Sequence, residues 1–186
     1  MKNKNYIMLT AVAALTLLAG CKEKKQSVDI IATKVEAPKP TAPKRMQPYN
    51  DERDVQWLGK TYSVAISRTP SDSLPMVSDE NGQKYVDNVI RLTVRRADGS
   101  VAISKTFLKT TFDSYLDDNY RRTGILEGFV FDEVDGSSLE FAASVSMPQS
   151  DDEYIPLDVK VDNYGNVTIK RDSQMDTSGT VDDDDE

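Results

Sequence analysis

The 186-residue sequence contains no histidine and a single cysteine. Without histidine there is no base for a Ser-His-Asp triad or a Cys-His pair, and no imidazole ligand for a metal. One cysteine excludes an intrachain disulfide, a Cys-x-x-Cys redox centre and a thiolate zinc site. The 23 Lys and Arg are outnumbered by 31 Asp and Glu, which argues against binding to a nucleic-acid backbone. We therefore expect no metal, no cofactor and no nucleic-acid partner.

Long apolar runs are also scarce, and the run from Tyr6 to Leu18 is shorter than the ~20 residues that a membrane-spanning helix needs. Because it follows Lys2 and Lys4, residues 1–20 are predicted to be a secretory signal peptide. The sequence Leu18-Ala19-Gly20-Cys21 resembles the lipobox of bacterial lipoproteins, in which the cysteine is acylated and the chain is cut before it. The resemblance implies lipidation at Cys21, membrane lipid as a partner, and a cell-envelope location anchored to the outer membrane, with the periplasmic or surface face left open.

Composition divides the remaining chain into three parts. Residues 21–50 are rich in proline and lysine, which predicts a disordered, extended tether. Residues 173–186 end in five consecutive acidic side chains, which repel one another and predict a disordered tail. Residues 51–172 between them are long enough to form one domain with its own core.

This domain shows the alternation of apolar and polar residues that is typical of antiparallel strands. Asn-Gly, Asp-Gly or Tyr-Gly pairs separate several of the alternating runs and favour tight hairpins. Phe112, Tyr115 and Leu116 instead have helical spacing and predict one short helix. We expect an all-β fold, an antiparallel meander of about seven strands closing into a barrel or sandwich, with strands near 60–68, 84–96, 101–108, 123–134, 138–147, 154–162 and 166–171.

Carboxylates are the remaining acid–base candidates, and they occur in three clusters near predicted turns, namely Asp113/Asp117/Asp118, Asp132/Glu133/Asp135 and Asp151/Asp152/Glu153. Acidic side chains are common in turns because they hydrogen-bond the local backbone. A glycosidase needs two carboxylates facing each other across a cleft, which clustering within one loop does not show. No Gly-x-Ser-x-Gly nucleophile motif is present. We assign no catalytic residue and expect no enzyme.

A recognition surface is the better prospect. Tyr115, Tyr120, Arg121 and Arg122 lie around the predicted helix and form a candidate binding patch, since aromatic residues and arginine are enriched at interfaces. Trp57 lies just before the first predicted strand. We expect it to pack the tether onto the core, with a ligand platform as the alternative.

Several phrases of the domain resemble an uncharacterised family of Bacteroidota lipoproteins built on a domain of unknown function. They are Ser73-Leu74-Pro75-Met76-Val77-Ser78-Asp79, Thr106-Phe107 through Tyr115-Leu116, Gly124-Ile125-Leu126-Glu127-Gly128 and Tyr154-Ile155-Pro156-Leu157. The resemblance implies a lipoprotein of the Gram-negative envelope and transfers no activity.

The sequence thus favours a membrane-anchored envelope lipoprotein with a non-catalytic binding or structural β domain. Its partner would be an envelope protein or a small apolar ligand. The alternative is a lipocalin-like periplasmic carrier that holds a small apolar ligand inside a barrel. A carboxylate-based hydrolase is the third hypothesis.

Overall fold

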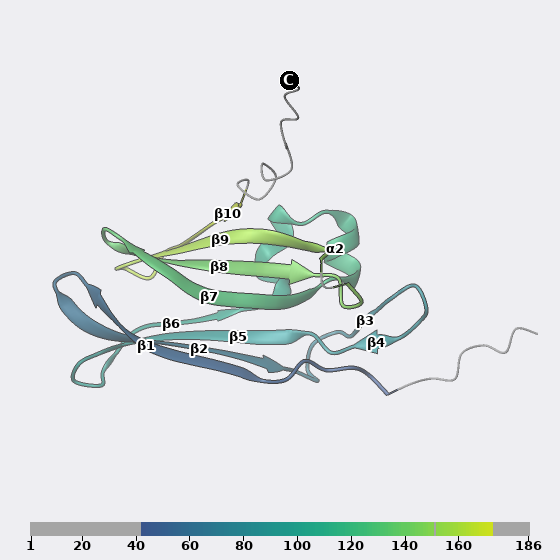
Figure 1. Ribbon diagram of the computed structural model, residues 1–186, viewed down its shortest axis with the longest axis horizontal. Coiled ribbons are helices and arrows are strands. Elements are labelled where there is room, and N and C mark those ends of the chain that lie inside the picture. The colour runs from purple at the N-terminus through teal and green to yellow at the C-terminus, as the bar shows by residue number, and fades with distance from the viewer. Residues whose placement is uncertain (1–41, 151, 173–186) are drawn as a thin grey trace, which may run out of the picture. The chain divides into compact units, whose positions relative to one another are not determined.

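A computed structural model describes residues 42–150 and 152–172. The predictions for the signal peptide, Cys21, the first part of the tether, Asp151 and the acidic tail lie outside these residues. The described chain forms antiparallel strands in three separate sheets, two of four strands and one of two. Figure 1 shows the two larger sheets lying face to face.

The first large sheet has the order β1-β2-β5-β6. Its strands are β1 (Tyr49–Trp57), β2 (Lys60–Pro70), β5 (Asn88–Arg96) and β6 (Val101–Phe107). The third sheet is a two-stranded hairpin, β3 (Val77–Ser78) and β4 (Lys84–Tyr85), inserted between β2 and β5. The insertion occupies one end of the molecule, near helix α2 (Figure 1).

The second large sheet is an uninterrupted meander in the order β10-β9-β8-β7. It consists of β7 (Ile125–Asp135), β8 (Ser138–Ser146), β9 (Tyr154–Asp162) and β10 (Val167–Arg171). Two short helices connect the large sheets, the 3-10 helix η2 (Lys109–Tyr115) and the α-helix α2 (Asp118–Thr123). The chain therefore passes from one layer to the other through the end that also carries the β3–β4 hairpin.

The core lies between the two large sheets. Apolar side chains at alternate strand positions point inward, and one buried cluster contains residues of both layers. Phe107 of β6 meets Phe129 of β7 with ring centroids 4.7 Å apart, and Phe129 meets Phe141 of β8 at 5.1 Å. Phe112 of η2 and Leu116 are also buried, which confirms the apolar face expected of the short helical segment. The all-β antiparallel fold is confirmed, and of its two expected forms the sandwich fits.

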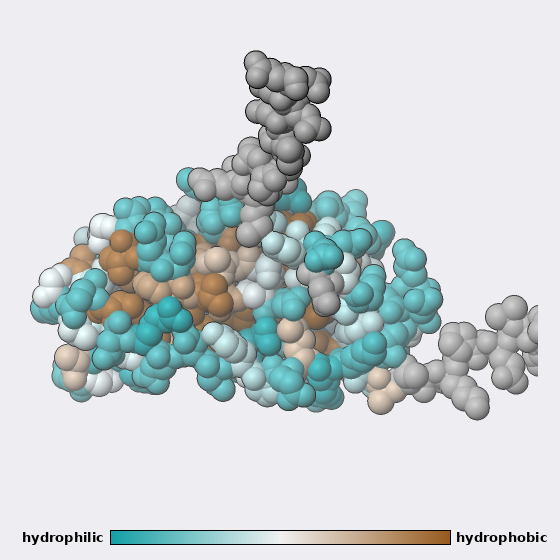
Figure 2. All heavy atoms as spheres, viewed as in Figure 1, coloured by the Kyte–Doolittle hydropathy of each residue, from teal (hydrophilic) through white to brown (hydrophobic). Residues whose placement is uncertain are grey.

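The surface follows from the same alternation. Figure 2 shows hydrophilic residues over most of the visible face and apolar residues gathered along the gap between the two sheets. Arg53 of β1 partly covers that gap, with its guanidinium 5.6 Å from the ring centroid of Phe131 on β7. Within the described residues, none of the helices has the length and apolar character needed to cross a bilayer.

Some predicted boundaries were wrong. The structure has an additional edge strand, β1, which begins at Tyr49, so the boundary at residue 51 falls inside an element. The predicted strand 84–96 is two strands, because the chain leaves β4 after Tyr85 and enters β5 at Asn88. The single short helix predicted around Phe112, Tyr115 and Leu116 is η2 followed by α2, and α2 includes Thr123, the expected first residue of the next strand.

The failure to predict β1 from the sequence has a physical explanation. Of its nine residues only Val55 and Trp57 are buried, because β1 is an edge strand. Its hairpin to β2 turns through Leu58 and Gly59, both at positive φ, and a Leu-Gly pair lacks the Asn-Gly or Asp-Gly signal of a tight turn. Trp57 is the last residue of β1, 2% exposed, with its ring 5.1 Å from that of Tyr62. It is therefore part of the core.

Candidate functional site

A buried polar cluster joins three chain junctions at the end of the sandwich that carries α2. Asp87 lies between β4 and β5, Lys109 is the first residue of η2, and Gly124 lies between α2 and β7. The Lys109 Nζ donates a hydrogen bond to the Gly124 carbonyl at 2.7 Å and lies 3.9 Å from Asp87 Oδ2. Asp87 Oδ1 accepts hydrogen bonds from the backbone N–H groups of Asn88 and Leu126 at 2.8 and 2.9 Å. These contacts fix the positions of β5, η2 and β7 relative to one another.

Gly124 is required at its position by close packing. A Cβ atom there would lie 2.7 Å from the Tyr120 carbonyl oxygen and 2.9 Å from Val145 Cγ1, which are both too short. Because its φ of −70° is ordinary for any residue, the requirement comes from space alone. The absence of a side chain lets the chain turn from α2 into β7 while presenting its carbonyl to Lys109.

Next to this cluster lies a cavity of about 400 Å³, which we call the Lys109 cavity. The loop that leads into β3 forms a mostly apolar wall. Helices η2 and α2 form the basic wall. Helix α2 also contacts β3, so the hairpin and the helix face each other across this end. The lining residues are Leu74, Pro75, Met76, Val77, Asp87, Leu108, Lys109, Thr110, Arg121 and Arg122.

Burial shifts both ionisable groups of the cluster towards their neutral forms. The pKa of Asp87 is raised above its ordinary value by loss of solvation, which outweighs its two backbone hydrogen bonds and the charge of Lys109. The pKa of Lys109 is lowered, again chiefly by loss of solvation, and the charges of Asp87 and Asp113 oppose that shift. Perturbed groups that line a cavity are a recognised mark of functional sites.

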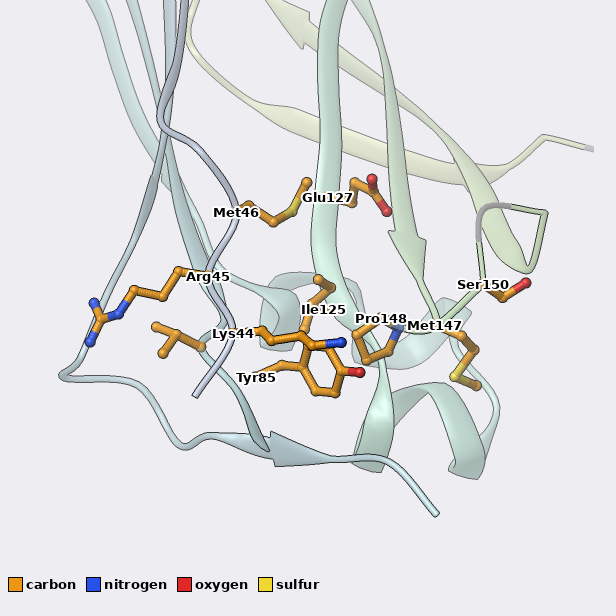
Figure 3. A pocket seen from close by; sticks show the side chains of 10 residues that line it. Lys44, Arg45, Met46, Tyr85, Ile125, Glu127, Met147, Pro148 and Ser150 are labelled. Atoms are coloured by element: carbon orange, nitrogen blue, oxygen red, sulfur yellow. The ribbon is translucent and has the colours of Figure 1, made fainter. Parts of the chain in front are cut away.

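A second pocket lies beside residues 42–48, which we call the arm. The arm pairs with β4 through a parallel bridge, in which Lys44 N donates to Lys84 O and Val86 N donates to Lys44 O, each at 2.9 Å. Lys44 Nζ lies 5.5 Å from the ring centroid of Tyr85. Figure 3 shows this lysine beside the Tyr85 ring, with Pro148 and Met147 on the opposite side. The pocket between them, the arm pocket, measures about 200 Å³.

The arm is docked on the domain at several further points. Met46 packs against a small buried cluster of Val77, Tyr85 and Ile125. Arg45 forms an ion pair with Asp72, which lies between β2 and β3. Arg68 of β2 donates one hydrogen bond to the Gln47 carbonyl at 3.2 Å and another to a carbonyl of β7. Part of the predicted tether is therefore structured, and the expectation that residues 21–50 lie outside the domain is corrected for the arm.

The Lys109 cavity is the better candidate for a ligand site. Small-molecule sites commonly measure ~300 to 1,000 Å³ and combine apolar walls with a few polar groups, and the Lys109 cavity meets both conditions. The arm pocket is smaller than that range, and the arm itself forms one of its walls.

The structure divides the predicted binding patch in two. Tyr115 of η2 and Tyr120 of α2 are half-buried and pack against the main core. Arg121 and Arg122, which follow on α2, line the Lys109 cavity. Arg121 donates to Asp118 Oδ1 at 2.6 Å and to the Asp113 carbonyl at 2.9 Å. The patch is therefore not a single surface, and only its two arginines belong to the candidate site.

Three of the clustered acids have local structural roles. Asp117 accepts hydrogen bonds from Asn119 N and Tyr120 N, both at 3.1 Å, and so caps α2. Asp118 pairs with Arg121, and Asp135 pairs with Lys160 across the sheet at 2.7 Å. In the part of the chain that the structure describes, no group of three or more Asp, Glu, His or Cys side chains is placed to hold a metal ion.

Three parts of the site were missed from the sequence. Asp87 falls in what reads as one long strand, and Lys109 follows a strand with no motif around it. The apolar wall from Leu74 to Val77 carries no functional signal in the sequence beyond its part in the family resemblance. A charged residue between two apolar runs, such as Asp87 after Tyr85-Val86, was the one available signal of a break in the strand.

The class of protein defined by this geometry is a β-sandwich with a ligand-sized cavity at one end. The family model for DUF4738, a domain of unknown function, matches residues 29–169, which is most of the chain. The protein therefore belongs to the DUF4738 family, and the expected domain of unknown function is confirmed. The match includes the arm, in agreement with its docking on the domain. No curated protein matches the chain.

Proposed function

We propose that this protein is a membrane-tethered envelope lipoprotein whose sandwich is a non-catalytic binding module, with the Lys109 cavity as its ligand site. The observation that carries the proposal is the cavity itself, in which an apolar wall faces Lys109, Arg121 and Arg122. Such a combination buries an apolar group and orients a polar one, which is the usual design of a small-molecule site.

The tether is proposed from the sequence Leu18-Ala19-Gly20-Cys21 and from the resemblance to Bacteroidota lipoproteins. Two or more acyl chains on Cys21 would hold the protein stably at a membrane. Metabolic labelling with a fatty-acid analogue should mark the wild type, and Cys21→Ser should abolish the label and release the protein into the soluble fraction. An unlabelled wild type that stays with membranes would reject lipidation as the anchor.

The alternative of a lipocalin-like carrier, with an apolar ligand inside a barrel, is less well supported than a ligand site at the end of the sandwich. Side chains fill the space between the two large sheets, as the contacts of Phe107, Phe129 and Phe141 illustrate. An apolar ligand held in the interior, as in a lipocalin, therefore has no support, and a ligand at the end of the sandwich is favoured instead. A hydrolase is disfavoured because Asp117 caps α2, and Asp118 and Asp135 are held in ion pairs with basic side chains.

The cavity can be tested by filling it. Thr110 is exposed and lines the cavity, whereas Thr106 is exposed on β6 away from it. We expect the neutral fluorescent probe N-phenyl-1-naphthylamine to bind the wild type and Thr106→Trp, and to bind Thr110→Trp much more weakly. Thermal unfolding of both variants controls for folding. Equal binding by the two tryptophan variants would reject the Lys109 cavity as the ligand site.

A further inference from the structure

The three basic side chains of the Lys109 cavity differ in whether they already have hydrogen-bond or ion-pair partners within the protein. Lys109 is about nine-tenths buried and is bonded to the Gly124 carbonyl, with Asp87 close by. Arg121 is held by Asp118 and by the Asp113 carbonyl. Within residues 42–150 and 152–172, by contrast, the guanidinium of Arg122 makes no hydrogen bond or ion pair. Its planar fork of donors is therefore available to a ligand.

The charge balance at the cavity wall favours an anion. Three basic side chains line the cavity and only one carboxylate does, and that carboxylate faces Lys109 and accepts two backbone hydrogen bonds. Guanidinium groups bind carboxylates and phosphates in a bidentate manner, and such charge-assisted bonds are stronger than neutral ones. The basic side of the cavity thus matches a small anionic head group.

The opposite wall matches an apolar group. Leu74, Pro75, Met76 and Val77 form this wall together with Leu108. Met76 is 42% exposed, which is high for a large apolar side chain, and contact with an apolar ligand would cover it. Burial of apolar surface favours binding in proportion to the area removed from water, so a tail of several methylene groups would strengthen binding.

We propose that the Lys109 cavity binds an anionic amphiphile, with its carboxylate or phosphate on Arg122 and its apolar tail against Leu74–Val77 and Leu108. This inference rests on the proposed function, because it assigns the ligand class of the same cavity. A free carboxylate and a phosphate head group share the chemistry that Arg122 would recognise, so the two sources are separated by experiment.

Matched ten-carbon probes test the assignment. Decanoate, decyl phosphate, decanol and decyltrimethylammonium should be titrated by calorimetry, below their micelle concentrations, into the chain from residue 21 onward with Cys21→Ser. We expect both anions to bind at least tenfold more tightly than decanol, and the cation to bind most weakly. Tighter binding of decanoate would indicate a free carboxylate as the ligand, and tighter binding of decyl phosphate a phosphate head group.

Two arginine variants test whether Arg122 recognises the negative charge of the ligand. Arg122→Gln should weaken decanoate binding about tenfold and leave decanol binding unchanged. Arg95→Gln removes an exposed arginine of β5 outside the cavity and should change neither. Equal affinities for decanoate and decanol, both lost in Thr110→Trp, would overturn the anion assignment and leave the proposed function intact. Binding of none of the probes, or binding unaffected by Thr110→Trp, would reject both.

Discussion

At the scale of single residues, the most informative group is the carboxylate of Asp87. It is 5% exposed and lies where β5, η2 and β7 meet, so its ionisation is coupled to the packing of all three. Burying a charge is costly unless it is paired and hydrogen-bonded, and Asp87 has both a cation and two backbone donors. Burial nevertheless dominates and raises its pKa.

The raised pKa gives a pH dependence of defined sign. The folded state holds the Asp87 proton more tightly than the unfolded state, whose pKa is near the ordinary 3.8. Its contribution to stability is therefore present below that value and is lost as the pH rises through the folded-state pKa. We expect the stability of the wild type relative to Asp87→Asn to fall as the pH is raised from about 3 to 6.

Urea unfolding of both proteins across this range measures the effect. Exposed acids with lowered pKa values, such as Asp72, Asp118 and Asp135, contribute with the opposite sign. They are common to both proteins and cancel in the difference. A difference that rises with pH would mean that Asp87 ionises more readily in the folded state, and that its partners outweigh its burial.

At the scale of the elements, strand β8 shows how register determines burial. Phe141 is 1% exposed and contacts Phe129 and Phe131, whereas Ser144 lies on the opposite face and is half-buried. Phe141→Ala should cost about 3 to 5 kcal/mol, because it removes a large buried ring and leaves a cavity. Ser144→Ala should cost less than about 0.5 kcal/mol.

Chemical denaturation of the two β8 variants gives both values. A one-residue slip of β8 would exchange the two outcomes, because neighbouring side chains point to opposite faces. Large losses for both variants would show that the outer face of this strand is also covered, which disagrees with the solvent-exposed Ala142 between them.

The elements also show how much of the fold can be predicted from one sequence. Strands β2 and β5 to β9 follow from period-two alternation, because each buries one face, and β10 follows because Val167 and Ile169 pack against the core from one face. Strand β1 does not, because it buries only Val55 and Trp57. The β3–β4 hairpin has two residues in each strand, too few for a period to be recognised.

The site was less predictable than the fold. The sequence predicts Arg121 and Arg122 as recognition residues, because arginine is enriched at interfaces and both lie near a predicted helix. Lys109 and Asp87 meet only through the tertiary packing of η2 on the junction between β4 and β5, which no local pattern encodes. The separation of Tyr120 from Arg121 and Arg122 likewise depends on which side of α2 faces the core.

At the scale of the whole molecule, the arm connects the described domain to the chain that precedes it. Because the arm pairs with β4 and Met46 covers Tyr85 and Ile125, it should contribute to stability. A chain that begins at residue 51 also lacks the first two residues of β1. We therefore expect it to unfold at a lower temperature than a chain that begins at residue 42.

Both chains should end at residue 172, so that they differ only in the arm and the start of β1. Met46→Ala in the longer chain is the matched control for the arm, and it should cost about 1 to 2 kcal/mol because Met46 is only half-buried. Identical melting temperatures for the two chains would show that the docked arm adds nothing to the domain.

The proposed ligand site in the Lys109 cavity is tested most directly by photolabelling. A decanoate with a diazirine on its tail should be irradiated with the Cys21→Ser protein, and the labelled residues should be mapped by mass spectrometry. If the ligand binds there, adducts should form on residues 74–77 and on Leu108, and unlabelled decanoate should suppress them. Adducts confined to the arm pocket, for example on Met46 or Met147, or spread over the outer faces of the sheets, would contradict the proposed site.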